Sequence, residues 1–193
     1  MDAARKVAFR DRAAWKEMSA MRNRLLIITA VAAAVTGVCG PAAVAAASAG
    51  DQDTAFARSA HQGNLAEIAA GQDAQKHAMT ACVKDVGAIL VADHQKLDTD
   101  LKAVAAKSTI PLPTMPSAEQ QQKLMTVQQQ AGTARYDAAW LADQEAAHTQ
   151  TLALIDKQIK TGTDTSLTNA AHKARPIVAM HLDMVRGGTC HAK

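Results

Sequence analysis

Between residues 54 and 186, apolar residues recur at intervals of three and four, and this spacing constrains the fold more than any other feature of the chain. Such intervals place side chains on one face of an α-helix, and no stretch shows the alternation that is typical of a half-buried strand. Only 3% of the residues are aromatic, whereas 48% are hydrophobic, with abundant alanine. Because strands favour aromatic and β-branched residues, this composition also indicates packed helices, and it excludes disorder.

The spacing, together with capping residues and helix breakers, predicts four long helices and a short glutamine-rich one. Asp53 is the expected N-cap of the first helix, Ser117 opens the short helix, and Gly132 ends it. Pro176 is expected to bend the last helix. The predicted helices cover residues 54–77, about 83–104, 117–130, 133–160 and 165–186.

The first 49 residues have a different character from the rest of the chain. A polar and basic stretch ends at Arg24, and the uncharged apolar run that follows ends in Ala47-Ser48-Ala49. A basic flank, an apolar segment and a small-residue end are typical of a secretory signal peptide. An uncleaved anchor is one alternative, since the uncharged run is long enough to span a bilayer. Lipidation at Cys39 is another, although its neighbours fit a lipobox poorly.

We therefore predict a signal peptide over residues 1–49, with Met18 or Met21 as later starts, and one helical domain over residues 50–193. The expected location is the periplasm or the outer membrane, and a peripheral association with the envelope is compatible with it. The leader holds seven of the 21 Lys and Arg and three of the 18 Asp and Glu, which leaves 14 basic and 15 acidic residues. The formal charge of +3 thus belongs to the leader, and we expect no nucleic-acid partner.

A connector with three prolines separates the second and third long helices. From Lys107 to Gly132 it is long enough to run the length of a bundle, whereas an up-down-up-down bundle needs only a short loop there. We predict an all-α fold, a ferritin-like four-helix bundle with a long crossover between helices two and three. The crossover brings Cys82 and Cys190 to the same end, and a simple bundle would separate them. Since an exported chain meets an oxidising compartment, we predict that they form a disulfide.

Each long helix carries one ligand-capable residue on its apolar line, and together they predict a metal site: Glu67, His94, His148 and His181. A bundle can bring inward His and Glu side chains together and exclude water from them. Three neutral imidazoles and a carboxylate suit iron, manganese, zinc or copper. The alternative is a buried hydrogen-bond network that specifies packing in a non-catalytic envelope protein of stress or structural type.

The residues around these four bear on which kind of metal site they could form. Glu145 and His148 match the Glu-x-x-His motif of di-iron bundles, but the chain holds no second copy, which argues against an oxidase or peroxidase-like enzyme. Asp93 and Asp137 either orient imidazoles or are solvated. The methionines around His181 offer soft ligands for cuprous ion, although methionine in a helical stripe more often fills a core.

Short motifs in register over residues 53–186 resemble one bacterial family. They are Glu67, Val83-Lys84, Asp93-His94, Ile110-Pro111-Leu112-Pro113, Tyr136-Asp137, Trp140-Leu141, Gly162, Asp164, Pro176 and His181-Leu182. The family is domain of unknown function four-one-four-two, an envelope family often labelled as outer-membrane protein. It usually has Asp where this chain has Ala147, so His148 lacks that partner. The resemblance implies an exported, ferritin-like helical domain and no particular activity.

Overall fold

The computed structural model describes residues 49–192. The predicted signal peptide, the alternative starts at Met18 and Met21, and Cys39 lie outside the described residues, apart from Ala49 at the end of the leader. The described part of the chain is all-helical and contains no β-strand, as predicted. Its elements are α2 (Ala49–His77), α3 (Ala81–Lys107), α4 (Ala118–Gln128), α5 (Tyr136–Thr161), α6 (Thr165–Val185) and the 3-10 helix η2 (Arg186–Gly188).

Side-chain caps mark where several helices begin. The Thr80 hydroxyl accepts a hydrogen bond from the amide of Val83 at the start of α3. Ser117 opens α4 as predicted, and it forms a reciprocal capping box with Gln120. Asp164 caps α6 by accepting from two backbone amides of its first turn.

The first two long helices, α2 and α3, pack with their backbones unusually close. A Cβ atom built on Gly71 would lie 2.5 Å from the carbonyl oxygen of Gly87, and one built on Gly87 would lie 2.8 Å from that of Gly71. Only glycine permits this approach, because any side chain would collide with the facing backbone. These two glycines therefore set how closely the backbones of α2 and α3 approach each other.

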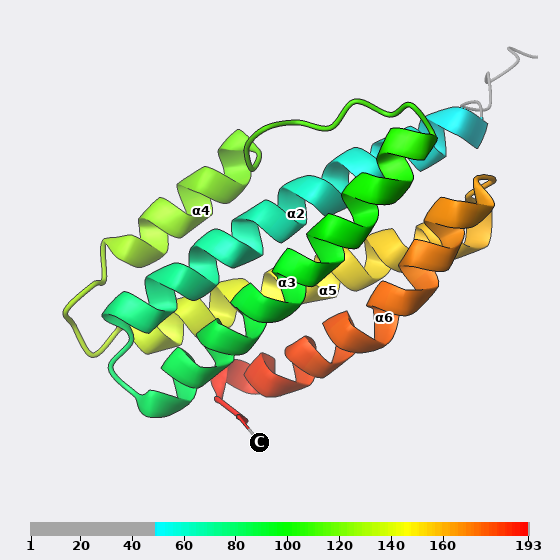
Figure 1. Cartoon of the computed structure of the whole chain (residues 1–193). Helices are drawn as coiled ribbons and strands as arrows, with labels where there is room; N and C mark the ends of the chain where they lie inside the picture. The colour runs from blue at the N-terminus through cyan, green and yellow to red at the C-terminus, as the bar shows by residue number, and fades with distance from the viewer. Residues whose placement is uncertain (1–48, 193) are drawn as a thin grey trace, which may run out of the picture. The chain divides into compact units, whose positions relative to one another are not determined.

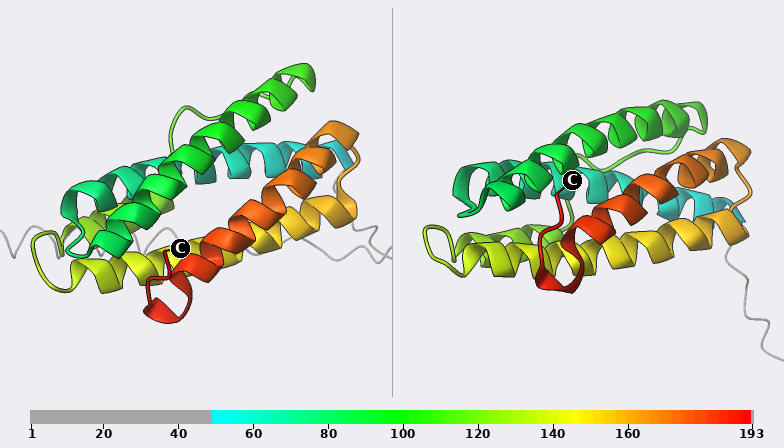
Figure 2. Two further views of the ribbon diagram at one scale, coloured as in Figure 1. Left: turned by 60° about the horizontal axis from the view of Figure 1, so that its bottom comes forward. Right: turned by 90° about the horizontal axis from the view of Figure 1, so that it is seen from below.

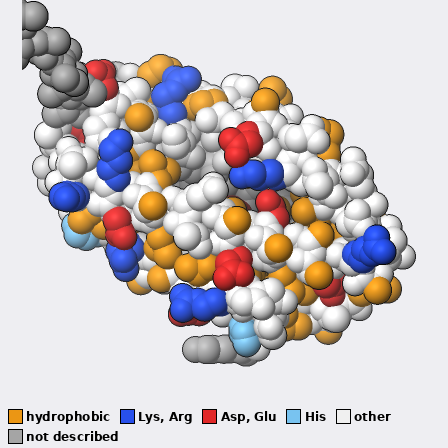
Figure 3. All heavy atoms as spheres, turned by 180° about the vertical axis from the view of Figure 1, so that it is seen from behind, with side chains coloured by type: hydrophobic (Ala, Val, Ile, Leu, Met, Phe, Trp, Pro, Cys, Tyr) orange, Lys and Arg blue, Asp and Glu red, His pale blue; other side chains and the backbone are white. Residues whose placement is uncertain are grey.

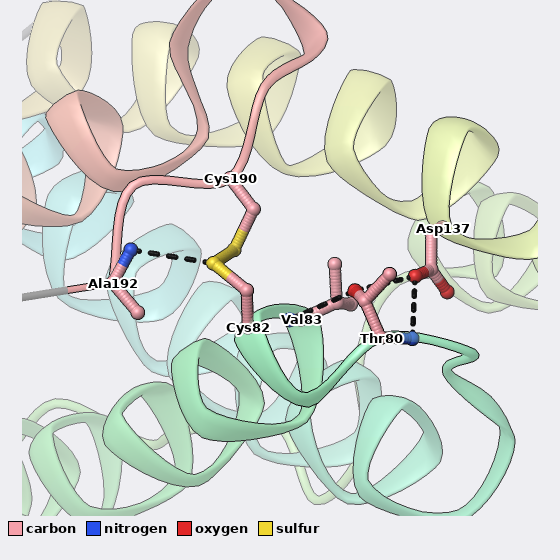
Figure 4. Close-up of a disulfide and its surroundings, with 6 residues drawn as sticks. All are labelled: Thr80, Cys82, Val83, Asp137, Cys190 and Ala192. Carbon is pink, nitrogen blue, oxygen red and sulfur yellow. Dashed lines mark hydrogen bonds between the residues drawn. A yellow bond between two sulfur atoms is a disulfide. The ribbon is translucent and has the colours of Figure 1, made fainter.

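Contacts at the two ends of the helices define their directions. At one end, the Asp137 carboxylate at the start of α5 accepts from the amides of Met79 and Thr80, just before α3. Figure 4 shows the contact with Thr80. At the other end, Asp53 near the start of α2 accepts from the amides of Thr163 and Asp164, just before α6. Helices α3 and α5 thus begin at the same end, as Figures 1 and 2 also show.

The segment between α3 and α5 returns along α2 (Figure 1). Three side chains of α2 hold its extended part by donating to backbone carbonyls: Arg58 to Pro111, His61 to Pro113 and Gln62 to Met115. Farther on, Gln128 of α4 donates to the buried carboxylate of Asp73 in α2. Tyr136 of α5 donates to the same carboxylate, so Asp73 links three segments.

The apolar core consists of two clusters. The first lies toward the start of α3 and α5 and includes Val86, Leu90, Trp140 and Met184. The second lies toward the start of α2 and α6 and includes Phe56, Leu101, Ile155 and Leu167. Trp140 packs α5 against α2 and donates its indole N–H to the carbonyl of Ala70. A layer of buried polar residues separates the clusters.

Cys82 and Cys190 lie at disulfide-bonding distance, with their Cα atoms 6.1 Å apart, so the predicted pairing agrees with the structure (Figure 4). The bond ties the first turn of α3 to the segment after η2 across 108 positions of sequence. The amide of Ala192 donates to the Cys82 sulfur and holds the last described residues against α3.

The described residues include no helix that combines the length and hydrophobicity of a membrane span. Acidic and basic side chains are interspersed on the face shown in Figure 3, without a continuous area of one sign.

Candidate metal centre

Three histidines from three helices meet in the polar layer between the two core clusters. His94 of α3, His148 of α5 and His181 of α6 each offer a ring nitrogen, and these nitrogens lie within 4.8 Å of one another. The ring centroids are 5.2 to 5.7 Å apart. All three side chains are at most 2% exposed. The structure thus brings together three of the four residues that the sequence predicts as ligands.

One nitrogen of each ring is anchored by an oxygen that can only accept a hydrogen bond. The pairs are His94 Nδ1 with Asn64 Oδ1 at 3.0 Å, His148 Nδ1 with the Gln144 carbonyl at 2.9 Å, and His181 Nε2 with Asp93 Oδ2 at 2.8 Å. Because these partners accept, the anchored nitrogens carry the protons of the neutral rings.

The other nitrogen of each ring therefore presents a bare lone pair. These atoms are His94 Nε2, His148 Nε2 and His181 Nδ1, and none of them has a hydrogen-bond partner. Buried polar atoms in native proteins are almost always satisfied, so three orphaned acceptors in one place need an explanation. No ring in the group can donate to another, since the proton of each neutral ring already points outward.

The surroundings keep the rings unprotonated. Burial is the main cause that holds the pKa of His94 well below its usual value, and the neighbouring histidines lower it further. Burial also lowers the pKa of His148 to about 4, although the Gln144 carbonyl acts in the opposite direction. The pKa of His181 is lowered by burial despite the nearby Asp93 carboxylate. At neutral pH the three nitrogens are thus available as ligands.

The triad has nearly the size of a loaded metal site. Three nitrogens that lie within 4.8 Å of one another surround a point no more than about 2.8 Å from each, and zinc–nitrogen bonds measure ~2.0–2.1 Å. Binding would require each ring to move inward by less than about 1 Å, which small side-chain rotations provide. Three protein ligands leave one position of a tetrahedral ion for water or another molecule.

Glu67 lies beside the triad and not within the group of converging ligand atoms. Its side chain is buried, it lines the same cavity as His94 and His148, and its Oε2 atom has no hydrogen-bond partner. Burial, reinforced by the Asp143 carboxylate, raises the pKa of Glu67 to about 8, while a hydrogen bond with Gln144 opposes the shift. In the metal-free protein Glu67 is therefore a neutral carboxylic acid at pH 7.

The two aspartates that were candidates for orienting imidazoles differ in role. Asp93 anchors His181, whereas Asp137 caps the turn before α3 and contacts no histidine of the triad. Glu145, the first residue of the Glu-x-x-His motif, accepts from the amide of Gly187. For His148, the hydrogen-bond acceptor is the backbone carbonyl of Gln144. The aspartate that the family usually has before this histidine is Ala147 in this chain.

Two buried residues of α2 were missed by the sequence reasoning, which followed the line through Ala60, Gly63 and Glu67. Asn64 anchors His94, and His61 is bound by the Asp98 carboxylate at 2.5 Å. The signal for both is the neighbouring line Ala57, His61, Asn64, with intervals of four and three, which faces α3. Because both lines of α2 contain small residues, the sequence pattern did not show which of them faces α3.

Comparison with known proteins gives one match. Residues 39–187 match the family described as Domain of unknown function (DUF4142). No curated protein and no solved structure matches the chain. The motifs that suggested this family include His94 and His181 of the triad, which lie within the matched region. Because the match covers most of the chain, the protein belongs to the DUF4142 family.

Proposed function

We propose that this protein binds a transition-metal ion through His94, His148 and His181. The observation that carries the proposal is the set of three bare, buried nitrogens that converge while the opposite nitrogen of each ring is anchored by an acceptor. An outer acceptor that fixes the tautomer and orientation of a histidine is the usual companion of a metal ligand. A cation in the centre would satisfy all three nitrogens at once.

Neutral imidazoles suit zinc, copper, iron and manganese in varying degree, and zinc and copper best. We place Glu67, the fourth predicted ligand, beside the position that the triad leaves open, since this residue lines the same cavity as His94 and His148 and has one buried, unpartnered oxygen. The chain offers no second Glu-x-x-His, and Glu145 is engaged elsewhere, so we propose a mononuclear site and no di-iron chemistry.

We further propose that the protein is exported to the bacterial envelope and that its helices form a ferritin-like bundle with a crossover. The composition of residues 1–49 and the pairing of Cys82 with Cys190 support export. The shared starting end of α3 and α5 supports the crossover. Fractionation of cells that produce the full chain tests the location: recovery of the protein in the cytosol with residues 1–49 retained would contradict export.

A second candidate function is structural, with the same histidines acting as a buried hydrogen-bond network. The observation in its favour is that every ring of the triad does hold one hydrogen bond to a neighbouring helix or to its own. This alternative leaves the inner nitrogens unexplained, and it predicts that a chelator does not change the melting temperature. A metal that binds only the folded state raises stability by about 2.7 kcal/mol at a concentration of 100 times Kd.

Metal analysis of the purified native full chain tests the proposal. We expect one metal ion per chain, its loss in the double variant His94→Ala/His181→Ala, and a lower melting temperature after chelation. His172→Ala is the matched control, because His172 is exposed on the same helix as His181 and should keep the metal. Substoichiometric metal that the double variant leaves unchanged would refute metal binding by the triad.

A further inference from the structure

His61 of α2 lies between two groups that can only accept a hydrogen bond. Its Nδ1 atom is 2.5 Å from Oδ1 of Asp98 in α3, and its Nε2 atom is 2.9 Å from the carbonyl oxygen of Pro113. Pro113 belongs to the extended part of the connector, residues 108–117, which Figure 1 shows along α2. The side chains of His61 and Asp98 are each 7% exposed, so the ring relies on these two partners.

A neutral histidine ring carries a single N–H and can donate to only one of these acceptors. In either neutral tautomer, the lone pair of the other nitrogen would face an acceptor oxygen, which is repulsive. Only the imidazolium form, with a proton on each nitrogen, satisfies both contacts at once. His61 thus differs from the rings of the triad, each of which has one nitrogen without a hydrogen-bond partner.

The charged groups around His61 come from two helices. In α3, Asp98 bonds the ring, and Nζ of Lys102 lies 3.4 Å from the other oxygen of the same carboxylate. In α2, Arg58 is exposed and donates to a carbonyl of the connector. Residues 108–117 carry no ionisable side chain, so the extended part adds no charge of its own. Among the described residues, Asp98 is therefore the anion that is paired with the ring.

The contact with Pro113 is one of three side-chain hydrogen bonds that tie α2 to the extended part of the connector. The other two, from Arg58 and Gln62, lie at the surface, and neither donor loses a proton near neutral pH. The extended part leads directly into α4, so these ties also hold the start of that helix. The wall of a second cavity, of about 180 Å³, includes Glu67 of α2 and three residues of α4: Gln120, Lys123 and Leu124.

We propose that His61 acts as a proton-dependent strap, which holds the connector against α2 as an imidazolium and releases it when one proton is lost. The proton that remains stays on Nδ1 beside the charged carboxylate, and the bare Nε2 atom then repels the Pro113 carbonyl. Release frees the start of α4 and opens the second cavity toward solvent. The strap does not require a metal in the triad.

The direction of the pH dependence follows from the proton count. The strapped form holds one more proton than the released form, so it prevails at low pH and is lost as pH rises. Histidine is the side chain that exchanges such a proton between about pH 5 and pH 8. Because one proton is involved, the ratio of released to strapped connector should rise by at most about tenfold per pH unit.

NMR spectroscopy of the full chain at about pH 5 and about pH 8 tests the proposal. The ring nitrogen signals of His61 distinguish the imidazolium from each neutral tautomer, and relaxation of the α-carbons of Thr114 and Met115 measures the mobility of the connector. At low pH we expect an imidazolium and order parameters near ~0.85. At high pH we expect a neutral ring and order parameters below ~0.6.

Two variants should abolish the pH dependence for different reasons. In Asp98→Asn, the new amide can donate to Nδ1 of a neutral ring whose Nε2–H still donates to Pro113, so the connector should stay ordered at both pH values. In His61→Gln nothing titrates at this position, so the order of the connector should be the same at both. Arg58→Met is the matched control, because it removes a tie that does not titrate and should keep the pH dependence of the wild type.

Four results would overturn the proposal: equal order of the connector at both pH values, a neutral His61 ring beside an ordered connector, a pH dependence that persists in His61→Gln, or one that persists in Asp98→Asn. Glu67 is retained in His61→Gln, so that variant separates its titration from that of His61. The amide of Gln121 donates to the Ser117 carbonyl in the first turn of α4. If its exchange, corrected for the intrinsic rate, does not speed up at high pH, the second cavity does not open.

Discussion

Replacing Glu67 with glutamine should stabilise the metal-free protein, by an amount that depends on pH. Burial and the Asp143 carboxylate raise the pKa of Glu67 from 4.5 in the unfolded chain to about 8 in the folded one. The folded state therefore binds the proton more tightly, and the wild type loses stability as pH rises from about 4.5 to about 8. Since one pKa unit corresponds to about 1.36 kcal/mol, the full loss is about 5 kcal/mol.

Glutamine has nearly the shape of the protonated glutamic acid and does not ionise in this range. The free energy of unfolding of Glu67→Gln minus that of the wild type should therefore grow between pH 4.5 and pH 8 and then level off. Urea unfolding followed by far-UV circular dichroism, in the presence of a chelator at a series of pH values, measures this difference. Asp85→Asn on the exposed side of α3 serves as the control and should give a small, constant difference.

A difference between Glu67→Gln and the wild type that does not change with pH would refute the reasoning. It would mean that the carboxylate keeps solvent contact or a charged partner in the folded state. A difference that falls as pH rises would reverse the sign of the effect, and it would require a Glu67 pKa below that of the unfolded chain.

Two further predictions concern stability. Reduction of the Cys82–Cys190 bond, which spans 108 positions, should lower the free energy of unfolding by about 4–5 kcal/mol, and urea unfolding of Cys82→Ser should show the same loss without responding to a reductant. Gly87→Ala should destabilise by about 1–3 kcal/mol because its Cβ would meet the Gly71 carbonyl at 2.8 Å, whereas Gly63→Ala, which meets no atom within 4 Å, should stabilise by up to about 1 kcal/mol. Thermal and urea unfolding measure both glycine variants, and equal effects at the two positions would contradict the close approach of α2 and α3.

The sequence was sufficient to place the histidines on three separate helices, because each stands in a line of larger apolar residues. His94 follows Leu90 at an interval of four, and His181 follows Val178 at an interval of three, so the apolar contrast marks the buried face. The cysteine pairing was also predictable, since it depends only on which helix ends lie together.

The parts that escaped prediction depend on rotation and on contacts between distant segments. In α2 most residues near Asn64 are small, so the periodicity does not distinguish the line that faces α3 from the next one. The partners Asp93 with His181 and Asp137 with Thr80 join positions 88 and 57 residues apart. Such pairs depend on the axial position of one helix against another, which a single sequence does not encode in its local pattern.

The division of the core by the histidine layer has a consequence for how the molecule opens. The half that contains Trp140 is held by the disulfide and by the carboxylate of Asp73. The half that contains Phe56 encloses the cavity, and it is held by the carboxylate of Asp53 and by hydrogen bonds from α2 to the connector. We expect amide hydrogens around the cavity to exchange faster than those around Trp140, through local opening of one half. An ion in the triad would join α3, α5 and α6 at the boundary and slow exchange on both sides of it.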